Sequence, residues 1–253
     1  EEVPRFRTYP AQKAKKDKLF EIYPFMGINT ANYTYKQVAH MLDKYFRDFS
    51  ASDSPAEREQ KLFDRMGQFA GDLDNEEACS NIFAGIKLYP PLGFAPWPED
   101  KEERRKVELL YATCSDKNIP LTVHCSTGGF HVTERGKVYT DPGNQWADVL
   151  RAYPGLKINF AHFGYGDPKW QEAIIDHINR DGSRVFTDFS SNGENDAYYR
   201  SLARVMAGES EKLGQRMLFG SDFMINLFWL NSFNQYLGYF FNTSHLSDSQ
   251  KLQ

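Results

Sequence analysis

Apolar and polar residues follow two alternating patterns along the chain. Short runs that are almost uninterruptedly apolar end in a polar residue, as expected of strands covered on both faces. The six predicted strands are Phe20 to Ile28, Ala84 to Tyr89, Leu121 to Cys125, Lys157 to His162, Arg184 to Phe189 and Arg216 to Asp222. Longer segments of helical period lie between them, so the pattern predicts βα units and a parallel sheet, an α/β fold.

The intervening segments carry apolar residues at positions i, i+3, i+4 and i+7, which predicts one buried stripe on each helix. These stripes are Val38, Met41, Leu42 and Tyr45; Val107, Leu110, Tyr111 and Cys114; Trp146, Val149, Leu150 and Tyr153; Trp170, Ala173, Ile174, His177 and Ile178; and Tyr199, Leu202, Ala203 and Met206. The charged segment Ser50 to Asn75 predicts a solvated helical excursion between the first two strands. Because no linker or repeat divides the chain, we expect residues 1–253 to form a single domain.

The spacing of the strands points to a barrel. From the second strand onward, the starts are separated by 37, 36, 27 and 32 residues. This rhythm fits a (β/α) barrel, whose full form has eight units in about 250 residues. Since only six strands are predicted, the pattern leaves two architectures open: an incomplete barrel or an open doubly wound sheet.

Composition and charge narrow the classes of function. The chain is 41% hydrophobic and contains 20 Phe, 14 Tyr and 4 Trp, enough to bury a large core. With 34 acidic and 30 basic residues, its net charge of -4 offers no basic face for phosphates, which excludes nucleic acid as an expected partner. The three scattered cysteines, Cys79, Cys114 and Cys125, argue for a reducing compartment, so we expect a cytoplasmic protein.

The ends of the chain and its most apolar segment carry further sequence signals. The start lacks Met and any signal peptide, and the last residues resemble the first turn of a helix, so we expect a chain cut at both ends. The apolar segment Ile225 to Phe241 is interrupted by Asn and Gln residues, which makes a membrane span improbable. Its aromatic side chains predict a lid over a pocket or a subunit contact, and hence a homodimer.

Polar residues end five of the predicted strands. They are Lys87, His124, His162, Asp188 and Asp222. In a barrel the carboxyl ends of the strands converge on one rim, so these side chains would share a pocket. Imidazole nitrogens and a carboxylate are ligands suited to Zn²⁺ or a similar divalent ion, which predicts a metal centre.

Each of these residues also has a purely structural interpretation. Either histidine alone fits a hydrogen-bonded core residue, Asp188 and Asp222 each fit a capping or turn position, and Lys87 can reach solvent. Their joint placement on one rim is what favours a shared site, because capping and solvation do not predict that coincidence.

Four strings carry a resemblance to a known family. They are Gly85 to Phe94, Pro120 to Cys125, Asn159 to Gly164 and Leu218 to Asp222. Together they resemble the amidohydrolase superfamily, in the amidohydrolase-related branch that includes aminocarboxymuconate semialdehyde decarboxylase. The resemblance covers roughly Phe20 to Gln253. It implies a (β/α)8 TIM barrel of the metal-dependent hydrolase type, of which this chain holds strands three to eight.

The resemblance also implies roles for individual residues. The family holds its metal with a His-x-His pair on strand one, a histidine on strand five and an aspartate on strand eight, with the strand-six histidine beside the ion. These map to His124, Asp222 and His162, so the predicted metal ligands are His124, Asp222 and His162. The strand-one pair has no counterpart, because no two of the six histidines are separated by one residue. We therefore expect the chain to lack the first two strands.

The other histidines differ in expected role. His40 lies off the apolar stripe of its helix and is expected to be exposed, whereas His177 lies on a stripe and is expected in the core. His131 follows Gly128-Gly129 in the loop after a strand, where it can face a substrate.

The predicted function is that of a metal-dependent hydrolase acting on a small carboxylate- or amide-containing substrate. A divalent ion, with zinc expected, would lower the pKa of its bound water from about 15.7 to about 7. His162 and Asp222 are the predicted catalytic residues, and Lys87, His131 and Asp188 are predicted to contact the substrate. Two alternatives stay open: non-oxidative decarboxylation of an aromatic or unsaturated acid, and an inactive barrel fragment or binding protein.

Overall fold

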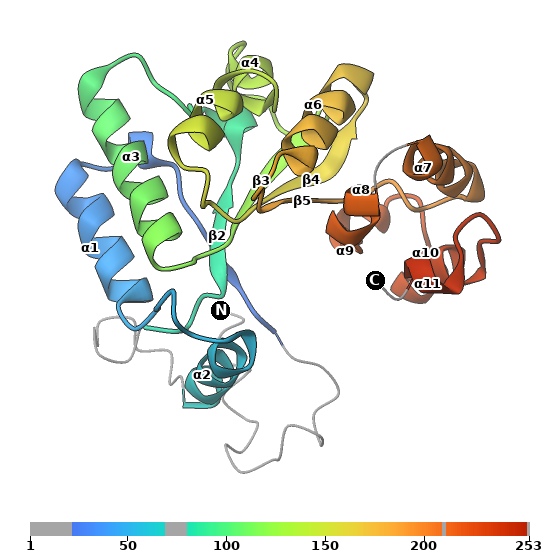
Figure 1. The fold of residues 1–253 in the computed structure, drawn as a ribbon, viewed down its shortest axis with the longest axis horizontal. Helices are drawn as coiled ribbons and strands as arrows, with labels where there is room; N and C mark the ends of the chain where they lie inside the picture. Colours follow the sequence, from blue (N-terminus) through green and yellow to red (C-terminus); the bar gives the residue numbers. More distant parts are fainter. Residues whose placement is uncertain (1–21, 69–79, 209–210, 252–253) are drawn as a thin grey trace. The chain divides into compact units, whose positions relative to one another are not determined.

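Within the part of the chain that the structure describes, six strands alternate with helices (Figure 1). The computed structural model describes residues 22–68, 80–208 and 211–251. The strands are β1 (Phe25–Gly27), β2 (Gly85–Leu88), β3 (Leu121–Ser126), β4 (Ile158–Tyr165), β5 (Val185–Asp188) and β6 (Met217–Leu218). All six predicted strands are therefore confirmed at their places, and the parallel pairing of β1 with β2, β4 with β5 and β5 with β6 confirms the α/β class. Residues 20 and 21 of the first predicted strand lie outside the described residues.

The chain forms two compact units, each described here by itself. The first comprises residues 1–88 and 98–121, and the second comprises residues 89–97 and 122–253. The first unit carries α1 (Tyr35–Phe46), α2 (Pro55–Gln68) and α3 (Lys101–Asp116). The second carries α4 (Gly136–Thr140), α5 (Gln145–Ala152), α6 (Pro168–Asn179), α7 (Asp196–Gly208), α8 (Glu211–Arg216), α9 (Phe223–Asn226), α10 (Phe233–Asn242) and α11 (Asp248–Lys251). The single domain over residues 1–253 stays a prediction.

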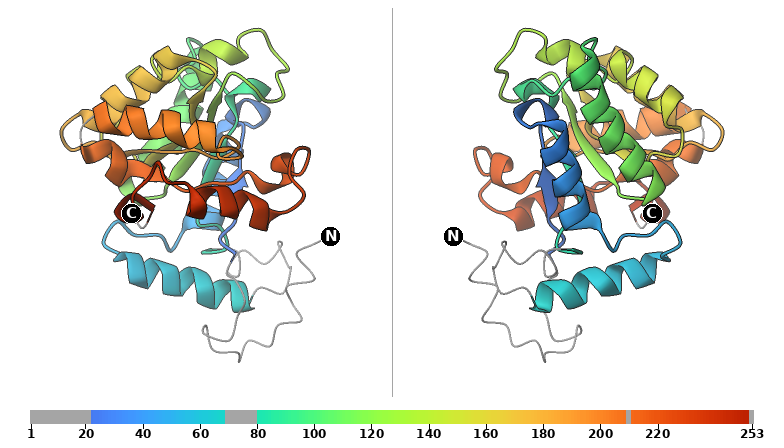
Figure 2. Two further views of the ribbon diagram at one scale, coloured as in Figure 1. Left: turned by 90° about the vertical axis from the view of Figure 1, so that its right-hand side faces the viewer. Right: turned by 90° about the vertical axis from the view of Figure 1, so that its left-hand side faces the viewer.

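In the first unit, α1 and α3 lie side by side (Figures 1 and 2). Helix α1 begins at Thr34, whose hydroxyl accepts from the Gln37 amide while the Gln37 side chain accepts from the Thr34 amide, a capping box. Its predicted stripe is buried at Val38 and Leu42, and His40 is exposed as expected. The capping box therefore sets the start of this helix, and the predicted stripe gives its buried face.

The charged segment Ser50 to Asn75 contains α2, which confirms a helix there up to Gln68. Residues 69–75 lie outside the described residues. The segment is anchored rather than merely solvated, because the Arg58 guanidinium stacks on the Phe49 ring at 4.0 Å and donates to the Ser50 carbonyl at 2.6 Å. A charge pattern alone does not reveal such an anchor.

In the second unit, α6 packs against β4 and β5 over an aromatic core. Trp146 meets Phe160 edge-on at 5.8 Å between ring centroids, and Phe160 stacks on His177 at 6.2 Å. His177 is buried, as predicted, and its Nε2 donates to the Pro142 carbonyl at 2.8 Å. Its Nδ1 has no hydrogen-bond partner within the described residues, so a proton on Nδ1 would be buried without an acceptor.

This burial makes stability depend on pH. Burial lowers the pKa of His177 in the folded protein, whereas in the unfolded chain it is about 6.5. The stabilising contribution is therefore complete above pH 6.5 and is lost as the pH falls from about 6.5 toward the folded pKa. Between pH 7 and pH 5, the unfolding free energy of the wild type is expected to fall with pH. We expect His177→Gln to reduce the slope of this fall by up to about 1.4 kcal/mol per pH unit, measured by urea titration. His40→Gln, on an exposed site, is the control; equal slopes in wild type and His177→Gln would contradict the expectation.

Strand β6 is shorter than predicted. The predicted strand runs to Asp222, but the structure ends it at Leu218. The following peptide groups bond to other elements: the Tyr236 hydroxyl donates to the Gly220 carbonyl at 2.8 Å, and the Ser191 amide donates to the Ser221 carbonyl at 3.4 Å. Asp222 therefore lies in a turn with φ +48° that leads into α9, not at a strand end.

The apolar segment Ile225 to Phe241 forms the end of α9 and most of α10 instead of one long helix. Within the described ranges, no helix combines the length and apolar character needed to cross a bilayer. Tyr236 is buried in α10, whereas Met224, Phe228 and Trp229 are 72–78% exposed in the unit as described. The lid, the subunit contact and the homodimer stay predictions.

Candidate functional site

Two of the predicted site histidines are in direct contact. His124 lies on β3 and His162 on β4, and both are buried. His124 Nδ1 and His162 Nε2 are 3.1 Å apart, and the ring centroids are separated by 4.8 Å. Both residues belong to the second unit, at neighbouring strands, as the barrel-rim argument predicted.

The outer nitrogens of the two rings fix their tautomers. His124 Nε2 lies 3.0 Å from the Gly128 carbonyl oxygen, and His162 Nδ1 lies 3.0 Å from the Ser190 carbonyl oxygen. A carbonyl oxygen only accepts, so each outer nitrogen carries a proton and donates it. The inner nitrogens then face each other at 3.1 Å, a separation that suits a shared proton or a cation held by both. Histidines that bind a metal are held by outer N–H donations of this kind.

Asp188, at the end of β5, supports His162 at its backbone amide directly and at its ring through Ser190. Its Oδ1 accepts from the His162 amide at 3.1 Å, from the Ser190 amide at 3.0 Å and from the Ser190 hydroxyl. The Ser190 hydroxyl in turn accepts from His162 Nδ1 at 2.9 Å. Asn159 donates to Oδ2 of Asp188 at 2.6 Å. Protein donors thus occupy both oxygens of this buried carboxylate, and its contact with a substrate stays a prediction.

The backbone at His162 adopts an uncommon conformation. His162, Phe163 and Gly164 have φ values of +70°, +49° and +60°. Such a conformation costs about 1–3 kcal/mol for each non-glycine residue and persists only where the surroundings impose it. Here the His162 amide donates to Asp188, and the His162 carbonyl accepts from the Asn192 side chain at 3.1 Å. These bonds fix the turn that directs the His162 ring at His124.

Tyr89 and the loop after β3 enclose His124. The Tyr89 ring stacks on the His124 ring at 4.5 Å, and its hydroxyl accepts from the Phe130 amide at 3.3 Å. Gly129, with φ +102°, lies so close that a Cβ atom there would be 2.6 Å from the Tyr89 hydroxyl and 2.9 Å from His124 Nε2. Sequence reasoning missed Tyr89; the available signal was its position directly after the strand that carries Lys87.

The remaining predicted residues have contacts of their own. Asp222 accepts from the Ser191 hydroxyl at 2.6 Å, next to Ser190. His131 is exposed in the loop after β3, where its Nε2 donates to the Thr127 carbonyl at 3.3 Å. Lys87 belongs to the first unit, where its position on β2 pairs with Gly27. The roles of all three stay predictions.

The donor set fits a divalent ion in part. His124 and His162 supply two nitrogens held in the manner of metal ligands, which suits Zn²⁺ and similar ions. Over the ranges that the structure describes, no three His, Cys, Asp or Glu side chains lie close enough to form a metal centre. The described residues therefore supply two of the donors that such a centre needs.

Comparison with known proteins identifies the family. The amidohydrolase family model matches residues 43–251. The chain belongs to the amidohydrolase family. The resemblance drawn from the four sequence strings is thereby confirmed, and membership in this family of enzymes supports an enzymatic role. No curated protein matches the chain significantly.

Solved structures give weaker similarities. A 2,6-dihydroxybenzoate decarboxylase in complex with 2,6-dihydroxybenzoate is 13% identical, with 78% of this chain and 65% of that chain covered and a TM-score of 0.42. A dihydroxybenzoic acid decarboxylase from a Polaromonas species, with manganese and 2-nitroresorcinol, is 15% identical, with 68% and 58% covered and a TM-score of 0.40. An amidohydrolase II is 12% identical, with 92% and 95% covered and a TM-score of 0.44. The chain thus spans less than two thirds of the length of the two decarboxylases.

Proposed function

We propose that this amidohydrolase is a divalent-metal-dependent hydrolase of a small carboxylate- or amide-containing substrate, with His124 and His162 at its centre. The observation that carries the proposal is the pair of inner nitrogens at 3.1 Å, each on a ring whose outer nitrogen donates to a carbonyl oxygen. Imidazole rings held by their outer nitrogens in this way can direct their inner nitrogens at one cation.

The candidate residues have separate proposed roles. His124 Nδ1 and His162 Nε2 would hold the ion, with Asp222 as the proposed third donor, and zinc is the expected metal. When bound, such an ion activates water and polarises a carbonyl group. Where His124 and Asp222 hold the ion without His162, His162 Nε2 is instead the atom that would take or give a proton, because Ser190 holds its Nδ1 as a donor. Contact of Lys87 with a substrate carboxylate is kept as part of the proposal from the sequence alone.

Metal binding by the full-length protein tests the proposal. We expect wild type to bind Zn²⁺ at about one ion per chain in isothermal titration. We expect His124→Ala to lose at least about 100-fold in affinity, because it removes a ligand outright. His40→Ala is the matched control, since His40 is exposed on α1. Equal, near-stoichiometric metal in wild type and His124→Ala would overturn His124 as a ligand.

The same titration on His162→Ala separates two roles. Loss of metal together with activity makes His162 a ligand, whereas loss of activity with metal retained makes it a base. Release of carbon dioxide from an aromatic acid, in place of hydrolysis, would replace the proposal with the decarboxylase alternative. A wild-type protein that binds neither Zn²⁺ nor Mn²⁺ would favour the binding-protein alternative.

A further inference from the structure

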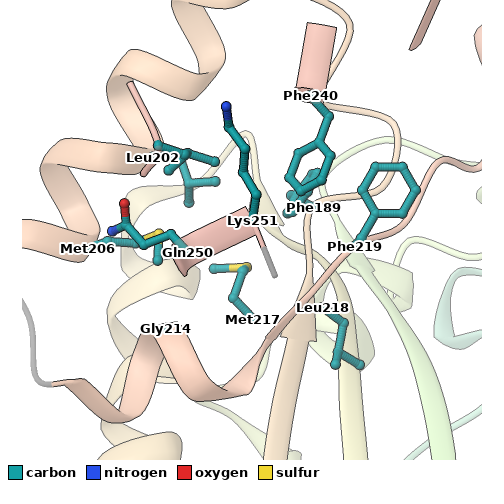
Figure 3. Close-up of a pocket in the computed structure, with 11 residues that line it drawn as sticks. Phe189, Leu202, Met206, Gly214, Met217, Leu218, Phe219, Phe240, Gln250 and Lys251 are labelled. Atoms are coloured by element: carbon teal, nitrogen blue, oxygen red, sulfur yellow. The ribbon is translucent and has the colours of Figure 1, made fainter. Parts of the chain in front are cut away.

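The second unit contains an apolar cavity of about 160 Å³, built from residues outside the candidate site (Figure 3). Its walls come from α7, α8, β6, α10 and α11. The innermost residues, all at most 9% exposed, are Phe189, Leu202, Met217, Phe240 and Leu246. Leu218 and Phe219, each about 40% exposed, line the cavity on its solvent side.

Two polar groups of the lining, the Lys251 ammonium and Oε1 of Gln250, are already bound within the chain. The Lys251 ammonium donates to the carbonyl oxygens of Phe241 at 2.9 Å and Thr243 at 2.7 Å, so it is held at the end of α10. Oε1 of Gln250 accepts from the Ser247 amide at 2.8 Å and from its hydroxyl at 3.1 Å. The aliphatic stem of Lys251 is therefore the part of this side chain that is left to line the cavity.

This lining favours an uncharged occupant over a charged one, because the lining residues that the structure describes present no carboxylate and no unbound ammonium. The wall consists mostly of aliphatic, aromatic and thioether groups, and Gly214, Gln250 and Lys251 contribute its polar part. An engineered apolar cavity of similar size, about 150 Å³, stays dry and binds benzene or xenon. Wall atoms that face an empty space also lose their dispersion contacts, so a fitting apolar molecule restores them.

The aromatic lining selects the class of ligand. Phe240 contacts Phe189 at 5.7 Å and Phe219 at 4.9 Å between ring centroids, and the sulfurs of Met206 and Met217 complete the lining. Ring edges and thioethers both make favourable contacts with a further aromatic ring. We propose that this cavity is a binding site for a small, uncharged molecule with a single aromatic ring. The proposal is independent of the proposed function, because no lining residue belongs to the candidate site.

Methionine methyl groups report binding directly. Met206 and Met217 line the cavity, whereas Met41 lies on α1 and Met224 is 72% exposed. In full-length protein with ¹³C-methyl methionine, benzene is expected to shift the Met206 and Met217 signals saturably. Burying one ring corresponds to a dissociation constant on the order of 1 mM. Absence of saturation at both signals, or equal shifts at Met224, would overturn the proposal.

Three variants and two further ligands extend the test. Met206→Phe, at a half-buried position, fills the cavity and is expected to weaken benzene binding at least about tenfold, while Met41→Phe leaves it unchanged. Should Met206→Phe fail to fold by circular dichroism, Leu202→Ala decides: it enlarges the cavity and is expected to bind naphthalene at least about tenfold tighter than wild type. Benzoate is expected to bind at least about tenfold more weakly than benzene. Unchanged affinities in these variants, or tighter binding of benzoate, would contradict the proposal.

Discussion

Gly129→Ala is expected to lower both zinc affinity and activity of the full-length protein by about 100-fold. Gly129 has φ +102°, a conformation that alanine adopts only with strain. Its Cβ would also lie 2.6 Å from the Tyr89 hydroxyl and 2.9 Å from His124 Nε2, closer than such atoms approach. Either the loop or the two stacked rings must move, and a shift of about 1 Å at a site can cost about 100-fold.

Two other glycines separate the clash from the strain. Gly128, the next residue along the chain, has open space: the nearest atom to its Cβ would be the Ser126 hydroxyl at 3.6 Å. Gly182 has φ +68° with no atom within 4 Å, so Gly182→Ala carries strain without a clash. We expect Gly182→Ala to lose about 1–2 kcal/mol of stability with unchanged zinc affinity. We expect Gly128→Ala to behave as wild type in zinc titration.

A result in which Gly129→Ala binds zinc as tightly as wild type would contradict this account of the loop. A result in which Gly182→Ala loses zinc to the same extent would assign the effect to general destabilisation. Thermal unfolding of all three variants distinguishes the two cases. If the loss of zinc affinity is local, Gly129→Ala and Gly182→Ala unfold at similar temperatures. If it reflects general destabilisation, they do not.

The apolar runs were sufficient to place every strand, because strands buried on both faces must be apolar throughout. The ends were harder to predict. Asp222 follows an apolar run as a strand end would, yet the peptide groups before it bond to Tyr236 and Ser191, which are distant in sequence. Local pattern carries no information about such partners, so the strand was predicted too long.

In the candidate site too, some residues could be predicted from the sequence and others could not. His124 and His162 were predicted because each ends an apolar strand, and neighbouring strands bring their ends together. Tyr89 and Ser190 were not predicted, since a stacked ring and a backbone-anchored hydroxyl have no characteristic spacing. The left-handed φ of His162 was equally hidden, because it depends on Asp188, 26 residues later in the chain.

Asp188→Asn is expected to destabilise the protein by about 2–4 kcal/mol and to detach His162 from its support. The carboxylate accepts from the amides of His162 and Ser190, from the Ser190 hydroxyl and from Asn159. An amide has only one oxygen, so its NH₂ group must face donors on one side or the other. Leaving buried donors unpaired in this way costs about 1–3 kcal/mol per group.

The orientation of the new amide group decides which hydrogen bond is lost. A second substitution identifies that orientation. If the amide keeps its oxygen toward His162, its NH₂ group faces the Asn159 NH₂ group, which now donates to Asp188 at 2.6 Å. Adding Asn159→Asp then restores a donor and an acceptor at this contact, and we expect it to recover at least about 1 kcal/mol in urea unfolding. Asp148→Asn is the matched control: its exposed pair with Arg151 predicts a change below about 0.5 kcal/mol. Unfolding of Asp188→Asn at the same urea concentration as wild type would show that Asp188 does not support His162, and the strained turn at His162 would then require another cause.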